Sequence, residues 1–213
     1  MKLEIAEIFY SIQGESSYAG LPCSFIRLAG CNLRCAYCDT RYAYINGQEL
    51  TIEDISQELV NLECPLVEIT GGEPLLQKNT PKLIDSLLAS GYTVLVETNG
   101  SLDIETIPEA AVIIMDIKCP SSGEVDSFFE ANIQKLRAND EVKFVIKDQE
   151  DYFFAKNIYL QEFGTKKNKV HFSPVFGVLE PSILAGWILA DRLAVYLHLQ
   201  LHKYIWAPET KGV

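Results

Sequence analysis

Three cysteines within eight residues are the part of this sequence with the clearest chemical meaning. Cys31, Cys35 and Cys38 stand in the stretch AGCNLRCAYCDT, with the spacing Cys-x3-Cys-x2-Cys. Three thiolates on one loop can ligate three irons of a [4Fe–4S] cluster and leave the fourth iron without a protein ligand. That open iron is a position at which a substrate or cofactor can bind, whereas a fully ligated cluster would indicate electron transfer.

Two other uses of clustered cysteines fit the chain less well. Disulfide frameworks belong to short secreted proteins, but this chain has 213 residues and begins MKLEIAEIFYSIQGE, which lacks the apolar core of a signal peptide. A structural zinc site needs four protein ligands. Zinc remains the weaker alternative, because no second Cys-x2-Cys pair exists among the other candidate ligands, Cys23, Cys64, Cys119, His171, His198 and His202.

Composition and charge restrict the class of protein. The hydrophobic fraction of 48% and the charged fraction of 22% are ordinary for a globular chain, and the length predicts a single domain over residues 1–213. No apolar run approaches the roughly 18 residues that span a membrane. The net charge of −11 argues against binding to nucleic-acid phosphates. We therefore expect a small-molecule enzyme of the reducing cytoplasm, with no membrane or nucleic-acid partner.

Apolar, β-branched runs alternate with helical patterns along the chain. This alternation indicates βα units and a parallel sheet. A complete eight-stranded barrel takes about 250 residues, so we expect an incomplete TIM-like barrel of about six parallel strands with flanking helices; a doubly wound open sheet is the alternative. The predicted strands are 24–28, 66–70, 93–97, 112–117, 141–146, 169–172 and 194–199, and the predicted helices are 52–62, 81–90, 127–138, 151–163 and 181–190.

Polar and glycine-rich motifs follow the predicted strands directly. In both candidate folds the chemistry belongs to the carboxyl ends of the strands. We therefore expect these motifs to meet at one end of the sheet. They are the cysteine loop after the first strand, TGGEP (70–74) after the second, ETNG (97–100) after the third, KCPS (118–121) after the fourth and SP (173–174) after the sixth.

The loop CNLRCAYCDT, followed about 30 residues later by TGGEP, resembles the radical S-adenosylmethionine (SAM) superfamily. The resemblance implies a [4Fe–4S] cluster on Cys31, Cys35 and Cys38, with SAM bound to the open iron. Cleavage of SAM by one electron from the cluster then yields a 5′-deoxyadenosyl radical. The SAM contacts implied at matching positions are Tyr37, Cys38, Asp39, Gly72, Lys118 and Ser173.

A narrower resemblance covers nearly the whole chain. The segments SIQGE (11–15), FIR (25–27), CDT (38–40), EITGGEP (68–74), VETNG (96–100), DIKCPSSG (116–123) and LQLHKYIW (199–206) resemble the 7-carboxy-7-deazaguanine synthase family. That family makes 7-deazapurines such as queuosine precursors. The resemblance implies a radical SAM carbon–nitrogen lyase that converts 6-carboxy-5,6,7,8-tetrahydropterin to 7-carboxy-7-deazaguanine and releases ammonia. It also implies Mg²⁺, a homodimer and an electron donor such as flavodoxin or ferredoxin.

The narrower resemblance assigns a substrate site and a metal ligand. Thr40 would be the protein ligand of Mg²⁺, which often keeps few protein ligands. Arg27 would bind the substrate carboxylate through two parallel hydrogen bonds, although a structural ion pair with a glutamate is the alternative for an arginine on a predicted strand. The substrate contacts implied at matching positions are Ile12, Gln13, Gly14, Arg27 and Thr70.

Two alternative functions stay open at this point. Another radical SAM enzyme, such as an activase that makes a glycyl radical on a partner protein, would share the cysteine spacing. SIQGE and Arg27 favour a small anionic substrate instead. A non-enzymatic iron–sulfur or zinc module for electron transfer or structure would have a fully ligated metal and would not bind SAM.

Overall fold

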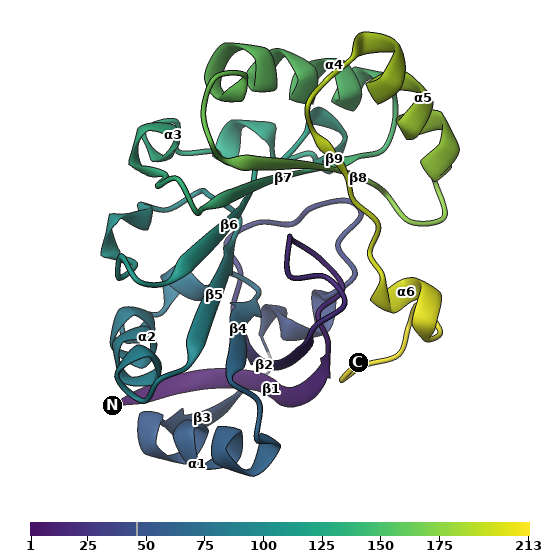
Figure 1. The fold of residues 1–213 in the computed structure, drawn as a ribbon. Helices are drawn as coiled ribbons and strands as arrows, with labels where there is room; N and C mark the ends of the chain where they lie inside the picture. The colour runs from purple at the N-terminus through teal and green to yellow at the C-terminus, as the bar shows by residue number, and fades with distance from the viewer. Residues whose placement is uncertain (46) are drawn as a thin grey trace.

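One curved sheet of nine strands organises the chain, in the order β3-β1-β2-β4-β5-β6-β7-β8-β9 (Figure 1). The computed structural model describes residues 1–45 and 47–213. Strand β1 is antiparallel to both β2 and β3, and every later neighbour pair from β2 to β9 is parallel. The strands are β1 (Lys2–Ile12), β2 (Pro22–Leu28), β3 (Gln48–Thr51), β4 (Leu66–Gly71), β5 (Thr93–Thr98), β6 (Val112–Asp116), β7 (Glu141–Ile146), β8 (Lys169–Pro174) and β9 (Tyr196–Leu197).

The sheet does not close on itself within the described residues, because β3 and β9 form its two edges. The predicted incomplete barrel of parallel strands is therefore confirmed. The parallel strands are β2 and β4 to β9, which makes seven rather than about six. The seventh, β9, contains only two residues.

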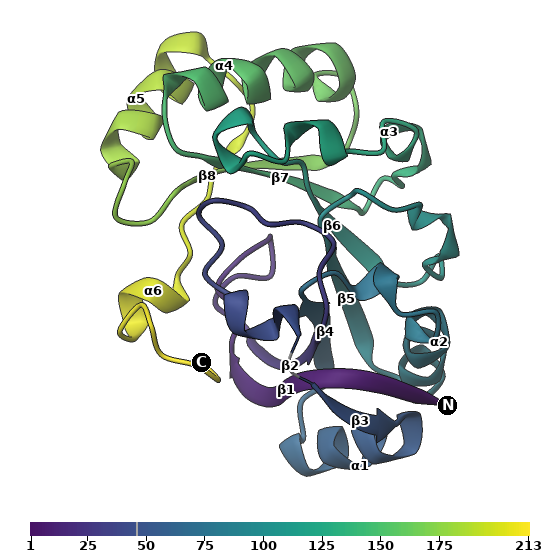
Figure 2. The same cartoon turned by 180° about the vertical axis from the view of Figure 1, so that it is seen from behind.

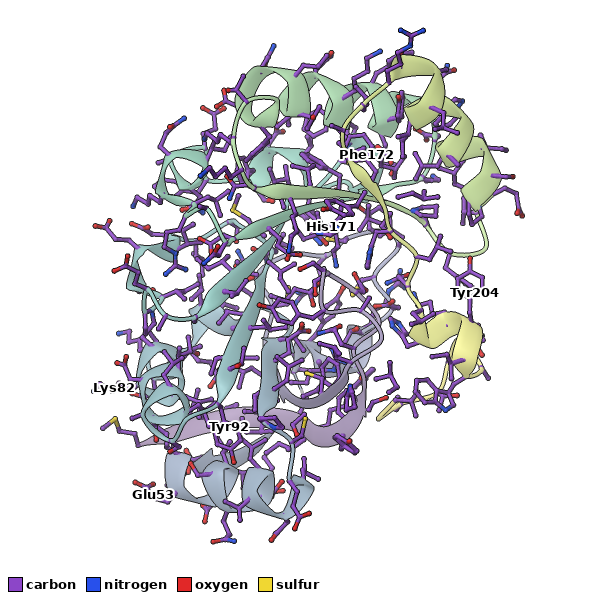
Figure 3. The ribbon with its side chains drawn as sticks, viewed as in Figure 1. Glu53, Lys82, Tyr92, His171, Phe172 and Tyr204 are labelled. Carbon is purple, nitrogen blue, oxygen red and sulfur yellow. The ribbon has the colours of Figure 1, made fainter. Side chains whose placement is uncertain are left out.

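The longer helices cover the outer side of the curved sheet (Figures 1 and 2). Side chains alternate between the two sides of each strand. On β8, Phe172 packs outward in the main core, with its ring 6.0 Å from that of Tyr152, whereas His171 points to the inner side (Figure 3). The helices are α1 (Ile52–Leu62), α2 (Thr80–Ala89), α3 (Asn132–Lys135), α4 (Gln149–Ile158), α5 (Pro181–Asp191) and α6 (His202–Ile205).

The first strand of the chain, β1, is missing from the prediction, as is the short β3. In β1, Leu3 and Ile5 are buried while Lys2 and Glu4 are exposed, which is the alternation of a half-buried strand. Both strands belong to an antiparallel extension of the sheet before the first βα unit. A prediction built on βα repeats does not include such an extension.

The predicted helix 127–138 is wrong over most of its length. Only α3 is α-helical there, after a 3₁₀ turn at Val125–Ser127. The buried Asn132 donates its side-chain amide to the carbonyl oxygens of Gly100 and Leu102, and Phe129 N also donates to Gly100 O. These bonds to a neighbouring loop compete with the helical pattern of hydrogen bonds.

The last predicted strand and the helix 151–163 also differ from the structure. Strand 194–199 shrinks to β9, after which a single bond from His198 N to Phe172 O ends the pairing. Helix α4 begins two residues early because the Asp148 side chain accepts hydrogen bonds from the first helical amides, and it continues as a π-helical turn, Tyr159–Phe163.

The hairpin loop 13–21 between β1 and β2 extends into the concave side of the sheet and reaches β7 (Figure 1). At its tip, the Ser17 amide and hydroxyl both donate to the Glu141 carboxylate on β7. At its base, Gly14 O accepts a hydrogen bond of 3.0 Å from Leu201 N in the C-terminal segment. The loop thus connects the beginning of the sheet to its end, across the gap that further strands would fill in a complete barrel.

Glu141 is the anchor of this loop, and its removal is expected to destabilise the fold. Its side chain is 1% exposed and lies 2.8 Å from His171 Nε2. Burial raises the pKa of Glu141, but the hydrogen bonds from His171 and Ser17 outweigh burial and lower it from 4.5 to about 2. The stabilisation is therefore present above pH 4.5 and is lost as the pH falls toward 2.

We expect Glu141→Gln to lower the free energy of unfolding at pH 7 by up to about 3 kcal/mol, which is the equivalent of that pKa difference. Urea unfolding at pH 7 and at pH 3 measures the effect, which should be smaller at pH 3. Glu53→Gln, at an exposed position of α1 (Figure 3), is the matched control. Equal stability of wild type and Glu141→Gln at pH 7 would contradict the anchoring role.

Candidate active site

A cavity of about 730 Å³ opens at the carboxyl ends of the parallel strands. Its volume is in the range of small-molecule sites in proteins. The wall combines residues 12–15, the cysteine loop, the ends of β4 to β7 and the C-terminal segment. Of the residues assigned to the site from sequence, all but Ser173 line this cavity.

The cysteine loop follows β2 and is held in shape by its own backbone and by two neighbouring segments (Figure 2). Cys38 N donates to Cys35 O at 3.1 Å, and the Arg34 guanidinium donates to Cys31 O at 2.9 Å. Ala36 N bonds to Ser122 O in the segment after β6. The three thiols are free, and burial raises the pKa of Cys31 and of Cys35.

The cysteines suit a cluster better than a single ion. All three line the cavity, so each thiol can meet a different corner of an iron–sulfur cube. A structural zinc ion needs four ligands around one point. Across residues 1–45 and 47–213, no three His, Cys, Asp or Glu side chains are placed to hold one ion.

The end of β4 packs directly against the cysteine loop. A Cβ atom on Gly72 would lie 2.0 Å from Gly30 O and 2.9 Å from Cys31 Cβ, so only glycine permits this approach. The next residue, Glu73, is fully buried and accepts hydrogen bonds from Thr98 Oγ1 at 2.8 Å and Asn99 N at 2.7 Å. The TGGEP segment therefore joins the cluster loop to the ends of β4 and β5.

A layer of charged side chains forms the inner floor of the cavity. Lys143 Nζ on β7 lies 2.7 Å from Glu15 Oε2, 2.5 Å from Glu97 Oε1 and 3.6 Å from Asp116 Oδ2. Burial lowers the pKa of Lys143, but these carboxylates outweigh burial and hold it well above its ordinary value. Thr70 Oγ1 donates to Glu97 Oε2 at 2.8 Å, so the predicted substrate contact on β4 belongs to the same network.

Both polar groups of the Gln13 side chain form hydrogen bonds within the protein. Its amide nitrogen donates to Glu68 Oε2 at 2.5 Å, and its amide oxygen accepts from Glu15 N at 3.0 Å. The residue is 2% exposed. With its side chain so engaged, the backbone of residues 12–14 is what this loop offers to a ligand in the cavity.

Arg27 forms the structural ion pair that was the alternative considered from sequence, and its side chain also lines the cavity. It pairs with Glu7 on the adjacent strand β1, with Nε 2.7 Å from Oε1, and the same oxygen accepts from Tyr42 at 2.6 Å. Burial lowers the pKa of Arg27, but Tyr42 and Glu7 raise it by more than burial lowers it, so the side chain stays charged. Within the described chain its terminal nitrogens have no protein acceptor, which leaves them for an anion in the cavity.

Asp39 and Thr40 connect the cysteine loop to the C-terminal segment. Thr40 Oγ1 donates to Asp39 Oδ1 at 2.9 Å, and Lys203 Nζ on α6 donates to Asp39 Oδ2 at 2.5 Å. Burial raises the pKa of Asp39, but Lys203 outweighs burial and lowers it. The Thr40 oxygen keeps lone pairs that a hard cation can use. Residues 208–213, whose role the sequence leaves open, also line this side of the cavity.

Tyr37 and Lys118 lie on the cavity wall beside the cysteines, but Ser173 does not. Lys118 Nζ donates to Asp116 Oδ2 at 2.9 Å, whereas Asp116 Oδ1 is buried without a partner in the described residues. That orphaned acceptor suits a hydroxyl donor of a bound ligand. Ser173 pairs with Val145 inside the sheet and is 1% exposed, while Val175 and the following residue form the wall beyond β8.

Comparisons with known proteins agree with this geometry. Residues 25–121 match the family model of the radical SAM superfamily. The chain is 46% identical to the 7-carboxy-7-deazaguanine synthase of Koribacter versatilis, over 99% of this chain and all of that protein. It is 47% identical to the synthase of Chlorobaculum tepidum, over 99% of this chain and 97% of the relative. The chain belongs to the 7-carboxy-7-deazaguanine synthase family.

A solved structure confirms the fold assignment for this member of the 7-carboxy-7-deazaguanine synthase family. The crystal structure of QueE from Escherichia coli superposes with a TM-score of 0.80 at 20% sequence identity and covers 95% of each chain. Membership of the radical SAM superfamily implies a [4Fe–4S] cluster and SAM, and the three thiols, the Gly72 approach and the orphaned Asp116 oxygen fit both. None of the described helices has the length and apolar character needed to cross a membrane.

Several side chains of this synthase-family site went unassigned at the sequence level. Glu68, Asp116 and Lys143 each interrupt a mostly apolar predicted strand, and Glu97 ends another. Charged residues inside buried strands are rare unless they are paired, so this interruption is the signal that identifies them. No comparable signal marks residues 208–213, which reach the cavity through the path of the C-terminal segment.

The contact at Gly72 leads to a testable prediction for the cluster. We expect Gly72→Ala to push the cysteine loop away from β4, because its Cβ would overlap Gly30 O. Iron and sulfide per chain after anaerobic reconstitution should fall at least threefold. Gly186→Ala on α5 is the matched control, since a Cβ there meets nothing within 4 Å. Full cluster content in Gly72→Ala would contradict the proposed contact.

Proposed function

We propose that this protein is a 7-carboxy-7-deazaguanine synthase, a radical SAM lyase. It converts 6-carboxy-5,6,7,8-tetrahydropterin to 7-carboxy-7-deazaguanine and releases ammonia, a step in 7-deazapurine synthesis. One observation carries the proposal. The three cysteines, the terminal nitrogens of Arg27 and the backbone of residues 12–14 all border the same cavity. The relatives that match this chain over its full length are named 7-carboxy-7-deazaguanine synthase.

The cofactor side of the cavity is formed by the cysteine loop and the strand ends beside it. In the proposal Cys31, Cys35 and Cys38 hold the cluster, which with SAM supplies a carbon-centred radical for hydrogen abstraction. The SAM contacts are Tyr37, Cys38, Asp39, Gly72 and Lys118, all on the cavity wall. Ser173, the remaining predicted SAM contact, does not line the cavity, although its buried hydroxyl has no partner in the described residues.

The substrate side of the cavity is formed by β1, β2 and β4. Arg27 orients the substrate carboxylate through its terminal nitrogens, while Glu7 holds its Nε. Thr70 and the backbone of Ile12, Gln13 and Gly14 complete the site. Thr40 is the protein ligand of Mg²⁺, and substrate and water supply the remaining ligands.

The structure favours a small substrate over the protein substrate of a glycyl-radical activase. Helix α6 and residues 208–213 lie across the open side of the sheet (Figure 1). The ion pair between Lys203 and Asp39 and the bond of 2.9 Å from Gln200 to Glu15 hold this segment against the cavity. A protein loop would have to displace these contacts, whereas a pterin fits within about 730 Å³.

The proposal includes a setting for the enzyme. Residues 1–213 act as one domain, as the continuous sheet supports. The protein works in the cytoplasm, where the cluster thiols stay reduced.

A homodimer is supported by exposed apolar side chains at one sheet edge, Tyr196 and Leu197, and Leu189 on α5. A flavodoxin or ferredoxin donates the electron near the exposed part of the cysteine loop, at Asn32 and Arg34.

Turnover with the carboxylated pterin tests the proposal directly. We expect reconstituted protein with SAM, Mg²⁺ and a reductant to form 7-carboxy-7-deazaguanine, detected by chromatography and mass spectrometry. Cys31→Ala should lose both turnover and the iron–sulfur absorbance, because three thiolates are needed. Cys64→Ala, at a cysteine outside the cavity, is the matched control. A Cys31→Ala protein with an intact cluster and full turnover would disprove the assignment.

Arg27 gives a separate prediction for substrate binding. Arg27→Ala should weaken binding of the pterin by about 2–5 kcal/mol, the range for removing one member of a buried charge pair. SAM affinity and cluster content should stay the same, because the side-chain partner of Arg27 is Glu7 and none of the proposed SAM contacts bonds to it in the described residues. Titrations with pterin and with SAM measure both, and Lys82→Ala on the exposed face of α2 is the control. Unchanged pterin affinity would refute the role of Arg27.

A further inference from the structure

Glu68 is a buried carboxyl group on the cavity wall that has no role in the proposed function. We propose that Glu68 is a positioning residue: it stays protonated when substrate binds, holds the Gln13 side chain, and thereby fixes the backbone of residues 12–14 against the substrate. This inference rests on the proposed function, because that function assigns the 12–14 backbone to the pterin.

The first support is the geometry of the Gln13 side chain. Glu68 Oε2 accepts its amide N–H at 2.5 Å, and the Gln13 amide oxygen accepts Glu15 N at 3.0 Å. Gln13 therefore bridges the centre of β4 to the turn of the loop. Without Glu68 the Gln13 amide nitrogen would be buried without an acceptor. Leaving such a donor unsatisfied costs about 1–3 kcal/mol. The loop would relieve that cost by moving its backbone.

The second support is the set of charges around Glu68. Glu15 from the loop and Glu97 from β5 both pair with Lys143, whose Nζ lies 2.7 Å from Glu15 Oε2 and 2.5 Å from Glu97 Oε1. The Cys23 thiol on β2 is neutral, because burial raises its pKa well above 9. Asp116 also lies 3.6 Å from Lys143 Nζ, so a charged Glu68 would add a further negative charge to a group in which one ammonium already faces three carboxyl groups. Since Glu68 is 5% exposed, water cannot screen that charge.

Burial and these two neighbouring carboxylates raise the pKa of Glu68 from 4.5 to about 8, against smaller opposing effects of Gln13 and Lys143. Glu68 is therefore neutral at pH 7. Above about pH 8 it becomes a carboxylate beside Glu15 and Glu97. That negative charge repels an anionic substrate and distorts the floor of the cavity, so substrate binding should weaken with rising pH.

Unfolding of the reconstituted protein tests the protonated state. A folded-state pKa above the unfolded value means that wild type loses stability through this group as pH rises from about 4.5 to about 8. Glu68→Gln lacks the titrating proton and keeps an acceptor for Gln13. The melting temperature of Glu68→Gln minus that of wild type should therefore increase between pH 5 and pH 8. The exposed control Glu53→Gln should show no such trend, and a constant difference for Glu68→Gln overturns the proposal.

Kinetics with the pterin test the positioning role. In wild type, KM for the pterin should rise up to tenfold per pH unit above about pH 8, and this rise should be absent from Glu68→Gln. Glu68→Leu has no acceptor for Gln13 and should raise KM about tenfold at pH 7, with the loss in KM rather than in kcat. Gln13→Leu should raise KM similarly, and the double variant should be no worse than either single one.

The outcomes separate this inference from the proposed function. Additive effects of the two leucine substitutions, or an alkaline rise of KM that persists in Glu68→Gln, overturn the positioning role while turnover itself stands. Absence of pterin turnover by wild type at every pH overturns the proposed function and the substrate part of the inference together. In that case the unfolding series still upholds or overturns the protonated state of Glu68.

Discussion

The pairing of the buried Lys143 ammonium is the interaction on which the rest of the site depends. A buried cation is stable only when carboxylates surround it, and here they come from three other elements: Glu15 in the loop 13–21, Glu97 on β5 and Asp116 on β6. Because these groups must stay within a few ångströms of Lys143, the loop and the strand ends keep one arrangement. The same contact brings the 12–14 backbone to the cavity opposite the cysteines.

The incomplete barrel explains how a chain of this length encloses a site. Where further strands would close the sheet, the loop 13–21 reaches β7 through Ser17 and Glu141, and the C-terminal segment returns to the cysteine loop through Lys203 and Asp39. Polar bonds thus replace missing sheet pairing. The resulting enclosure serves radical chemistry, because it keeps water and side reactions away from reactive intermediates.

Local patterns predicted most of the sheet, and they failed where distant contacts decide the structure. The strands β4 to β8 fall on the predicted runs rich in apolar and β-branched residues, and α1 starts at a capping box formed by Thr51 and Asp54. The helix predicted at 127–138 lost its regular pattern because Asn132 bonds to a loop about 30 residues away. Strand β1 was missed because its antiparallel partner precedes the βα repeats.

The sequence by itself determined the chemistry: the spacing of Cys31, Cys35 and Cys38, the glycines after β4, and an arginine on β2 are local features that need no fold to be recognised. Only the tertiary structure decided the roles of side chains that meet across the sheet. In the folded chain the Gln13 side chain bonds to Glu68, Arg27 pairs with Glu7, and Ser173 is buried outside the cavity wall. The physical reason is that hydrogen bonding, burial and protonation depend on distances between strand ends, which residues far apart in the chain set together.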